Sequence, residues 1–263
     1  MDALSTLYLE HCAAEREPAN TIAARGRVLR LVGNAGSATR EDVEAWWGSR
    51  AHLSPATRVA DLALLRAFYK WCAIWEHRED DPTVRLKPPH VPNRVPRPAR
   101  RTDVKRLILS LPPDMGRACA LGAYLGLRVS ESARLSWADI DTDEGMVRVE
   151  KSKGGKTRLV PLSPALVDML GGELPGANVV TRSATEYDPG VLSTKLNRAM
   201  KRAGVKATSH QLRHLFGTTA YEVSGGDILA VRDLMGHEST QTTASYARPS
   251  ADMGRRIADA MLD

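Results

Sequence analysis

The amino-acid sequence predicts two domains: a wholly helical N-terminal domain, and a mainly helical C-terminal domain with a small antiparallel β-sheet. Three observations lead to this fold class. Apolar residues recur at helical spacing through residues 1–86. A basic segment rich in proline, residues 87–100, then interrupts the helical pattern. In residues 101–263, helical patterns surround two short apolar runs joined by a Gly-Gly loop, which is the pattern of a β-hairpin.

Four helices are predicted in the N-terminal domain, over residues 4–14, 20–32, 40–49 and 55–75. Gly33 is expected to end the second helix, and Thr39 with Asp42 to cap the third. Ser54 and Pro55 open the longest helix, since proline is tolerated in a first turn. This helix carries an apolar stripe that indicates core packing: Val59, Leu62, Leu65, Phe68, Tyr69 and Cys72.

Four tryptophans lie in the same domain: Trp46, Trp47, Trp71 and Trp75. Their rings could stack on nucleic-acid bases. Core packing is the commoner use of an aromatic residue at helical spacing, so we expect these side chains to be buried.

The segment at 87–100 is predicted to be an extended linker, because it contains five of the fifteen prolines and each proline fixes φ and lacks an N–H donor. Between Leu86 and Arg106 there are seven basic residues and one acid, a charge of +6 that equals the net charge of the whole chain. The basic residues are Lys87, Arg94, Arg97, Arg100, Arg101, Lys105 and Arg106. This excess favours a polyanion such as nucleic acid as partner, although a solvated linker can have the same composition.

In the C-terminal domain, Thr102 is expected to cap a helix of about nine residues. A helix over 114–125 should end at Gly126, and a short helix should follow Ser130. Strands are predicted at 146–150 and 158–161, and further helices at 164–170, 190–203, 209–223, 227–235, 239–247 and 250–262. The acidic run Asp139, Asp141, Asp143 and Glu144 lacks the rest of a calcium loop, so we expect a polar turn there.

The composition excludes several classes of protein. With 43% apolar and 26% charged residues, the chain is neither disordered nor a coiled coil. It contains no apolar run near the roughly 20 residues of a membrane helix, and no signal peptide is visible. The three cysteines, Cys12, Cys72 and Cys119, are scattered, which predicts reduced core thiols in a cytoplasmic protein.

Four motifs indicate the chemistry: GLRVSE at 126–131, EKSKGGKTRLVPL at 150–162, HQLRH at 210–214 and GHESTQTTASY at 236–246. Each motif alone has an ordinary structural explanation, such as a helix-end cation or a surface ion pair. Together they supply two arginines, two histidines, a lysine on a loop and a late tyrosine. Arginine and histidine can hold the charge of a pentacoordinate phosphorane, lysine or histidine can protonate a leaving alcohol, and tyrosine can attack phosphorus. The set is therefore sufficient for phosphoryl transfer without a metal ion.

In order and spacing, the four motifs resemble the tyrosine recombinase, or phage integrase, family, and in particular its compact Xer-like members. The resemblance implies a SAM-like core-binding domain at 1–86, a linker at 87–100, and a catalytic domain at 101–263 with a docking helix at 250–262. Because the helical domain is predicted to begin almost at Met1, we expect no arm-binding domain before it.

The resemblance also implies roles for individual residues. Arg128, Arg213 and His237 would hold the scissile phosphate, and His210 would assist as acid or base. Lys153 would be the general acid, although Lys151 and Lys156 lie close enough to compete for that role. Tyr246, nine residues after His237, would be the nucleophile. Glu131 and His214 would be supporting residues, as would Ser209.

The resemblance implies a site-specific DNA recombinase that needs no cofactor or metal ion and forms a tetramer on double-stranded DNA through the C-terminal helix. Its exchange would pass through a Holliday junction, in phage integration or in the resolution of plasmid or chromosome dimers. We expect DNA contacts from Lys87, Arg94, Arg97, Arg100 and Arg101. Two alternatives are a type IB topoisomerase, which nicks and reseals one strand, and a catalytically silent DNA-binding regulator.

Overall fold

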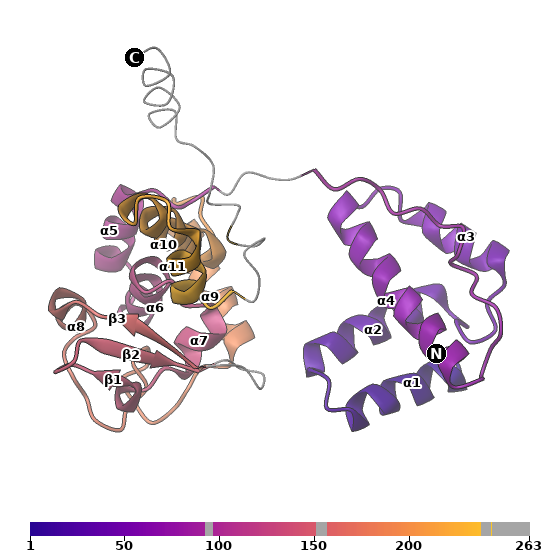
Figure 1. The fold of residues 1–263 in the computed structure, drawn as a ribbon, viewed down its shortest axis with the longest axis horizontal. Coiled ribbons are helices and arrows are strands. Elements are labelled where there is room, and N and C mark those ends of the chain that lie inside the picture. Colours follow the sequence, from indigo (N-terminus) through magenta and orange to yellow (C-terminus); the bar gives the residue numbers. More distant parts are fainter. Residues whose placement is uncertain (93–96, 151–156, 238–242, 244–263) are drawn as a thin grey trace, which may run out of the picture. The chain divides into compact units, whose positions relative to one another are not determined.

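The computed structural model describes residues 1–92, 97–150, 157–237 and 243. The chain forms two compact units, Met1–Arg94 and Val95–Asp263. The described residues are mostly helical, with one small antiparallel sheet in the C-terminal unit (Figure 1).

The N-terminal unit consists of four helices: α1 (Ala3–Ala14), α2 (Ala19–Val32), α3 (Arg40–Ser49) and α4 (Pro55–Ile74). The residues predicted to begin or end these helices lie at the helix ends. Gly33 ends α2 with φ of +90°, and Thr39 forms a reciprocal capping box with Asp42 at the start of α3. Ser54 Oγ accepts a hydrogen bond from Thr57 N at the start of α4.

The core of this unit lies where α1, α2 and α4 pack together, and Tyr8, Leu29 and Phe68 are buried in it. Trp46 and Trp71 are buried and Trp47 packs against the same core, as predicted. The prediction is wrong for Trp75, which is 55% exposed because it lies one residue past the end of α4.

The C-terminal unit begins with α5 (Arg101–Ser110), α6 (Pro113–Tyr124) and α7 (Val129–Arg134). A short 3-10 helix η1 (Trp137–Asp139) leads into strands β1 (Ile140–Asp141), β2 (Met146–Val149) and β3 (Arg158–Pro161). The remaining helices are α8 (Pro164–Met169), α9 (Pro189–Arg202), α10 (Ser209–Val223) and α11 (Ile228–Met235). The helices predicted at 239–247 and 250–262 lie outside the described residues, apart from Thr243.

The sheet has the order β1-β2-β3 and is antiparallel throughout, with Ile140 opposite Val147 and Val149 opposite Arg158. The sequence predicted β2 and β3 but not β1, because a two-residue strand is too short to show an alternating pattern. Asp141 Oδ1 accepts from Glu144 N, so part of the acidic run forms the expected turn between β1 and β2. The predicted cap at Thr102 is also wrong: α5 begins one residue earlier, with Arg100 at the N-cap position and no side-chain cap bond.

Helix α6 is at the centre of the C-terminal unit and packs against α5, α7, α9 and α10. Eight of its residues are buried, among them Cys119 and Gly122. All three cysteines of the chain are buried and form no disulfide, as predicted. None of the helices in the described ranges has the length and apolar character needed to cross a membrane.

Candidate active site

The turn between α6 and α7 contains the motif GLRVSE and packs against α10. Gly126 has φ of +64°, which glycine adopts without strain, and a Cβ at this position would clash with the ring of Phe216. Arg213 of α10 donates a hydrogen bond from Nη1 to the Gly126 carbonyl. The turn therefore joins two motifs that are 87 residues apart in sequence.

Glu131 is a buried carboxylate bound by arginines from three segments. Arg128, three residues earlier in the chain, donates to the Glu131 carboxylate from its backbone N at 2.7 Å and from Nη1 at 2.9 Å. Arg158 of β3 donates from Nη1 at 3.0 Å and from Nη2 at 2.8 Å, a bidentate pair. Arg213 Nη1 lies 3.7 Å from Glu131 Oε2. Burial alone would raise the pKa of Glu131, but the bonds and charges of Arg158 and Arg128 lower it to about 2. Glu131 is therefore ionised at neutral pH.

The same three arginines bind consecutive carbonyl oxygens at the end of α11. The bonds are Arg158 Nε to Leu234 O at 2.9 Å, Arg213 Nη2 to Met235 O at 2.5 Å, and Arg128 Nη2 to Gly236 O at 3.2 Å. Cations are favoured there because a helix has its negative dipole end at the C-terminus. Gly236 ends α11 in the left-handed conformation, and His237 follows directly. The arginines thus fix the point at which the chain leaves α11 toward His237.

Two histidines of α10 and His237 are held in their neutral forms. The rings of His210 and His214 lie 4.3 Å apart in an edge-to-face arrangement. Burial, with the charge of His210 and Arg213, lowers the pKa of His214 to about 4. Burial, with the charges of Arg213 and Arg128, lowers the pKa of His237 to about 4 and also lowers that of His210. Each imidazole is therefore available as a neutral donor or acceptor when the arginines are charged.

His237 also contacts Thr243, which is fully buried: Nδ1 lies 2.9 Å from the Thr243 hydroxyl oxygen. A hydrogen bond at Nδ1 fixes the orientation of the imidazole ring. In the sequence, Thr243 precedes Tyr246 by three residues.

The structure brings together Arg128, Glu131, His210, Arg213, His214 and His237 of the predicted site. Lys153 and Tyr246 lie outside the described residues, as do Lys151 and Lys156. Ser209 is the first residue of α10, and its backbone N donates to Asn197 Oδ1 at 2.8 Å.

Among the described residues of this cluster, three guanidinium groups and one carboxylate give two positive charges when the histidines are neutral. The side chain of Arg128 is 40% exposed, whereas those of Arg158 and Arg213 are 9% and 4% exposed. An anion from solvent can therefore reach Arg128 directly. A site with this charge and these neutral imidazoles is suited to a phosphodiester whose charge increases during reaction.

Comparison with known proteins identifies the family of this chain. The phage integrase family profile matches residues 117–253, just over half of the chain. The tyrosine recombinase XerA of Thermococcus kodakarensis is 35% identical over 73% of this chain and 70% of its own length. The chain belongs to the phage integrase family. Membership confirms the family predicted from the four motifs and makes the chain a tyrosine site-specific recombinase.

Further relatives extend the match over most of the chain. The tyrosine recombinase XerD of Caulobacter vibrioides is 28% identical over 95% of this chain and 93% of its own length. A crystal structure of a lambda integrase dimer bound to a core site has a TM-score of 0.76 and 18% identity, and covers 95% of this chain and 96% of that one. The mostly helical architecture with a small antiparallel sheet is therefore the integrase catalytic fold.

Sequence reasoning missed two residues that contact this candidate site, Arg158 and Thr243. Both lie inside quoted motifs, and the only sequence signal was their place there. Arg158 meets Leu234, which is 76 residues away in the sequence, so no local pattern could reveal the contact. Thr243 looks like one of several polar residues in a run of Ser and Thr.

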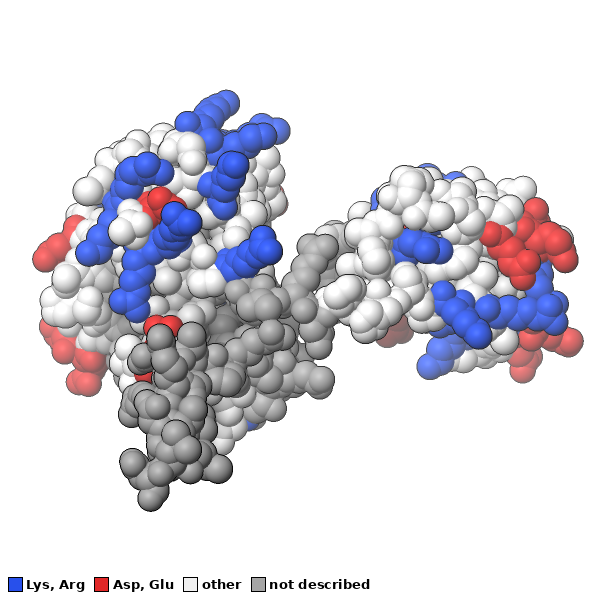
Figure 2. Space-filling model, turned by 90° about the horizontal axis from the view of Figure 1, so that it is seen from above, with Lys and Arg blue, Asp and Glu red and all other residues white. Residues whose placement is uncertain are grey.

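The predicted DNA-contacting residues that the structure describes are exposed: Lys87, Arg97, Arg100 and Arg101. Arg94 lies outside the described residues. Lys105 and Arg106 extend the exposed basic surface along α5. Lys and Arg side chains also predominate on the face of the C-terminal unit seen in Figure 2.

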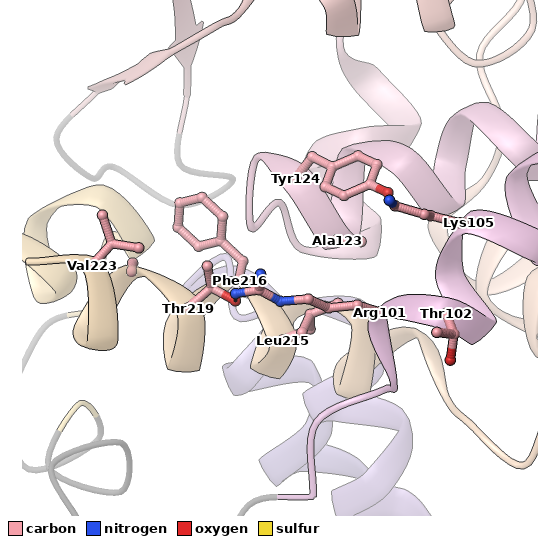
Figure 3. A pocket seen from close by; sticks show the side chains of 10 residues that line it. Arg101, Thr102, Lys105, Ala123, Tyr124, Leu215, Phe216, Thr219 and Val223 are labelled. Atoms are coloured by element: carbon pink, nitrogen blue, oxygen red, sulfur yellow. Dashed lines mark hydrogen bonds between the residues drawn. The ribbon is translucent and has the colours of Figure 1, made fainter. Parts of the chain in front are cut away.

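A cavity of about 520 Å³ between α5, α6 and α10 is separate from this site (Figure 3). Its wall on α10 is formed by Leu215, Phe216, Thr219 and Val223. By helical spacing, His210 and His214 of the site lie on the opposite side of α10. Arg101 crosses its rim and donates to Thr219 Oγ1 at 3.1 Å. Its walls are mainly apolar and carry none of the candidate catalytic residues.

The described residues contain no group of three or more His, Cys, Asp or Glu side chains arranged to hold a metal ion. In the acidic run, Asp139 Oδ2 accepts from Ser136 N and Asp141 Oδ1 accepts from Glu144 N. These two carboxylates therefore stabilise local backbone turns.

Proposed function

We propose that this chain cuts and rejoins double-stranded DNA at specific sites through a covalent bond between Tyr246 and a 3′-phosphate. The observation that supports this most directly is the cluster of Arg128, Arg213, His210 and His237 around Glu131. Two net positive charges there match the two negative charges of a phosphorane formed from a phosphodiester.

In the first step, the Tyr246 oxygen attacks the scissile phosphorus and the bond from phosphorus to the 5′-oxygen breaks. Arg128, Arg213 and His237 stabilise the non-bridging oxygens. His210, kept neutral by its lowered pKa, can accept the tyrosine proton. Lys153 gives a proton to the departing 5′-oxygen.

In the second step, the 5′-hydroxyl of a partner strand attacks the phosphotyrosine and releases Tyr246. The number of phosphoester bonds is unchanged in each step, so rejoining needs no high-energy cofactor. The solved structures of lambda integrase include a tetramer bound to a Holliday junction. We therefore propose that exchange here also passes through such a junction, within a tetramer that docks through helix 250–262.

We assign residues 1–86 to a SAM-like core-binding domain and 87–100 to a linker that follows the DNA backbone. The lambda integrase that matches both units of this chain is bound to a core site. Exposed Lys87, Arg97, Arg100 and Arg101 suit phosphate contacts, which fix position without reading sequence. A DNA-acting enzyme of this kind would work in the cytoplasm.

The test is to trap the covalent intermediate. Incubation with a nicked suicide duplex, from which the cleaved strand end diffuses away, should give protein linked to the 3′ end of the DNA. Tyr246→Phe should bind the same duplex and give no adduct, because it lacks the attacking oxygen.

A second measurement separates recombination from nicking and resealing. Joining of strands from two different duplexes supports a recombinase, whereas relaxation of supercoils without strand exchange indicates a topoisomerase. An adduct that persists in Tyr246→Phe contradicts the assignment of the nucleophile. Binding without any adduct in the wild-type chain indicates a silent regulator.

A further inference from the structure

All three guanidinium nitrogens of Arg158 donate to groups of the protein. Nη1 and Nη2 form the bidentate pair with Glu131, and Nε donates to the Leu234 carbonyl. Its side chain is 9% exposed. A substrate phosphate approaching from solvent therefore meets Arg128, which is 40% exposed, before the more buried Arg158 and Arg213.

The bidentate pair determines how much positive charge the other arginines offer to DNA. Arg158 and Glu131 carry opposite charges at 2.8 to 3.0 Å, so they neutralise one another. Without Arg158, the negative charge of the buried carboxylate would be compensated by Arg128 and Arg213, the other cations beside it in the part of the chain that the structure describes. Both would then be drawn toward Glu131 and would stabilise a phosphate less.

Arg158 also fixes the end of α11. Its Nη1 lies where a Cβ on Gly236 would come within 2.9 Å, so the guanidinium packs closely against the residue before His237. Leu234 O, Met235 O and Gly236 O each accept from a different arginine, and Arg158 provides the first of these bonds.

We propose that Arg158 is a positioning residue for strand cleavage: it neutralises and orients Glu131, so that Arg128 and Arg213 keep their charge and direction for the scissile phosphate. This inference rests on the proposed function. It predicts that Arg158 acts on charge stabilisation at the phosphate rather than on DNA binding or on protonation of the leaving group.

The test compares Arg158→Gln with the wild-type full-length chain in single-turnover cleavage of two suicide duplexes. One has a normal scissile phosphate and the other has a methylphosphonate, in which a methyl group replaces one charged oxygen. On the phosphate, cleavage should slow about 10²-fold, the usual effect of a misplaced catalytic group. On the methylphosphonate the defect should be at least tenfold smaller, because less charge develops, and DNA affinity should be unchanged. Equal defects on the two substrates, or normal cleavage of the phosphate, would overturn the proposal.

A double variant tests whether Arg158 acts through Glu131. Glu131→Gln with Arg158→Gln should cleave no more slowly than Glu131→Gln alone, whereas multiplied defects would show independent roles. Arg117→Gln is the matched control, since Arg117 is a half-buried arginine that donates Nε to the Val180 carbonyl at 2.9 Å. It should lower the melting temperature and leave the cleavage rate unchanged.

Arg158→Lys keeps the charge but loses the bidentate geometry, and it takes the place of Arg158→Gln if circular dichroism shows that the glutamine variant does not fold. Its defect should be smaller than that of Arg158→Gln and should shrink in the same way on the methylphosphonate. A wild-type chain that formed no adduct would contradict the proposed function instead, so the two failures are distinguishable.

Discussion

At the scale of single residues, the site separates permanent charge from titratable charge. Arg128, Arg158 and Arg213 surround the carboxylate of Glu131, whose pKa is near 2, so this carboxylate is ionised over the working range of pH. The histidines are partly buried and lie close to the same guanidinium groups, and both burial and these charges oppose a positive charge on the imidazoles. As a result, protonation of the imidazoles is coupled to the stability of the fold.

We expect the free protein to lose stability as the pH falls from 6.5 to about 4. His214 and His237 have a pKa near 4 in the folded chain and an ordinary value of 6.5. Between these values the unfolded chain binds more protons, so the free energy of unfolding decreases on acidification. Glu131, with its pKa lowered from 4.5 to about 2, adds a similar loss only at lower pH. Urea unfolding followed at several pH values measures this slope.

His214→Gln removes one of the two histidines and should make the decrease between pH 6.5 and about 5 less steep. The matched control is His90→Gln, because His90 is an exposed histidine of the proline-rich segment and should leave the slope unchanged. A slope in His214→Gln equal to that of the wild type would show that this imidazole is not held neutral.

At the scale of elements, the end of the proline-rich segment is fixed to α10, the helix that carries the motif HQLRH. Gln211 Nε2 donates to Arg97 O at 2.9 Å, and Ala99 N donates to Gln211 O at 3.0 Å. Ala99 is buried in the core of the C-terminal unit. The exposed Arg97 and Arg100 are therefore presented from a segment that is anchored on α10, beside His210.

We expect this segment to supply much of the salt dependence of DNA binding. Replacing Arg94, Arg97, Arg100 and Arg101 by glutamine should lower the slope of log affinity against log salt by up to about 3.6, since each phosphate contact contributes about 0.9. The same four positions changed to lysine keep the charge and should keep the slope. Fluorescence anisotropy with a labelled duplex at several salt concentrations gives both values, and a slope that the glutamines leave unchanged would mean that these arginines face solvent.

Most helices could be predicted from the sequence because their end signals are local. Thr39 with Asp42, and Thr208 with Gln211, form capping boxes within one turn. Strand β1 could not be predicted, because it exists only through pairing of Ile140 with Val147. Thr102 was misassigned as a cap because a threonine before an apolar pattern is indistinguishable from one inside the first turn.

The same distinction applies to the site. Four of the candidate residues lie in recognisable sequence motifs, so the sequence alone could select them: Arg128, His210, Arg213 and His237. The hydrogen bonds from arginines to the carbonyl oxygens of Leu234, Met235 and Gly236 could not be predicted. Every residue has a backbone carbonyl, so its use as an acceptor leaves no pattern in the sequence. Arg158 was missed for this reason.

At the scale of the whole molecule, activity must depend on assembly if the reaction exchanges strands between two duplexes. The sequence after the proposed nucleophile provides a means for this. Pro249 is followed by Ser250, a residue suited to cap a helix, and then by Met253, Ile257, Ala260 and Met261 at helical spacing. A helix of about a dozen residues is marginal in isolation, so its apolar stripe must dock on a protein surface.

We expect a chain truncated after Pro249 to remain folded and to bind a single half-site. It should fail to form synaptic tetramers and should not recombine, because docking on a neighbouring protomer would couple assembly to the placement of Tyr246. Native gel electrophoresis of protein–DNA complexes measures assembly, and strand transfer between two duplexes measures recombination. Ile257→Asp should reproduce the truncation by breaking the stripe, whereas Asp259→Ser, a change on the polar side, should not.

Mixing two defective chains distinguishes docking on the neighbour from docking on the same chain. The truncated chain retains Tyr246 but lacks the tail, and full-length Tyr246→Phe has the tail but lacks the nucleophile. If the tail docks on a neighbour, the full-length variant supplies it to the truncated chain, and covalent adducts of the truncated size should appear in the mixture alone. Docking within one chain gives no such complementation, since the active chain never receives a tail. Normal recombination by the truncated chain by itself would show that the tail does not assemble the complex.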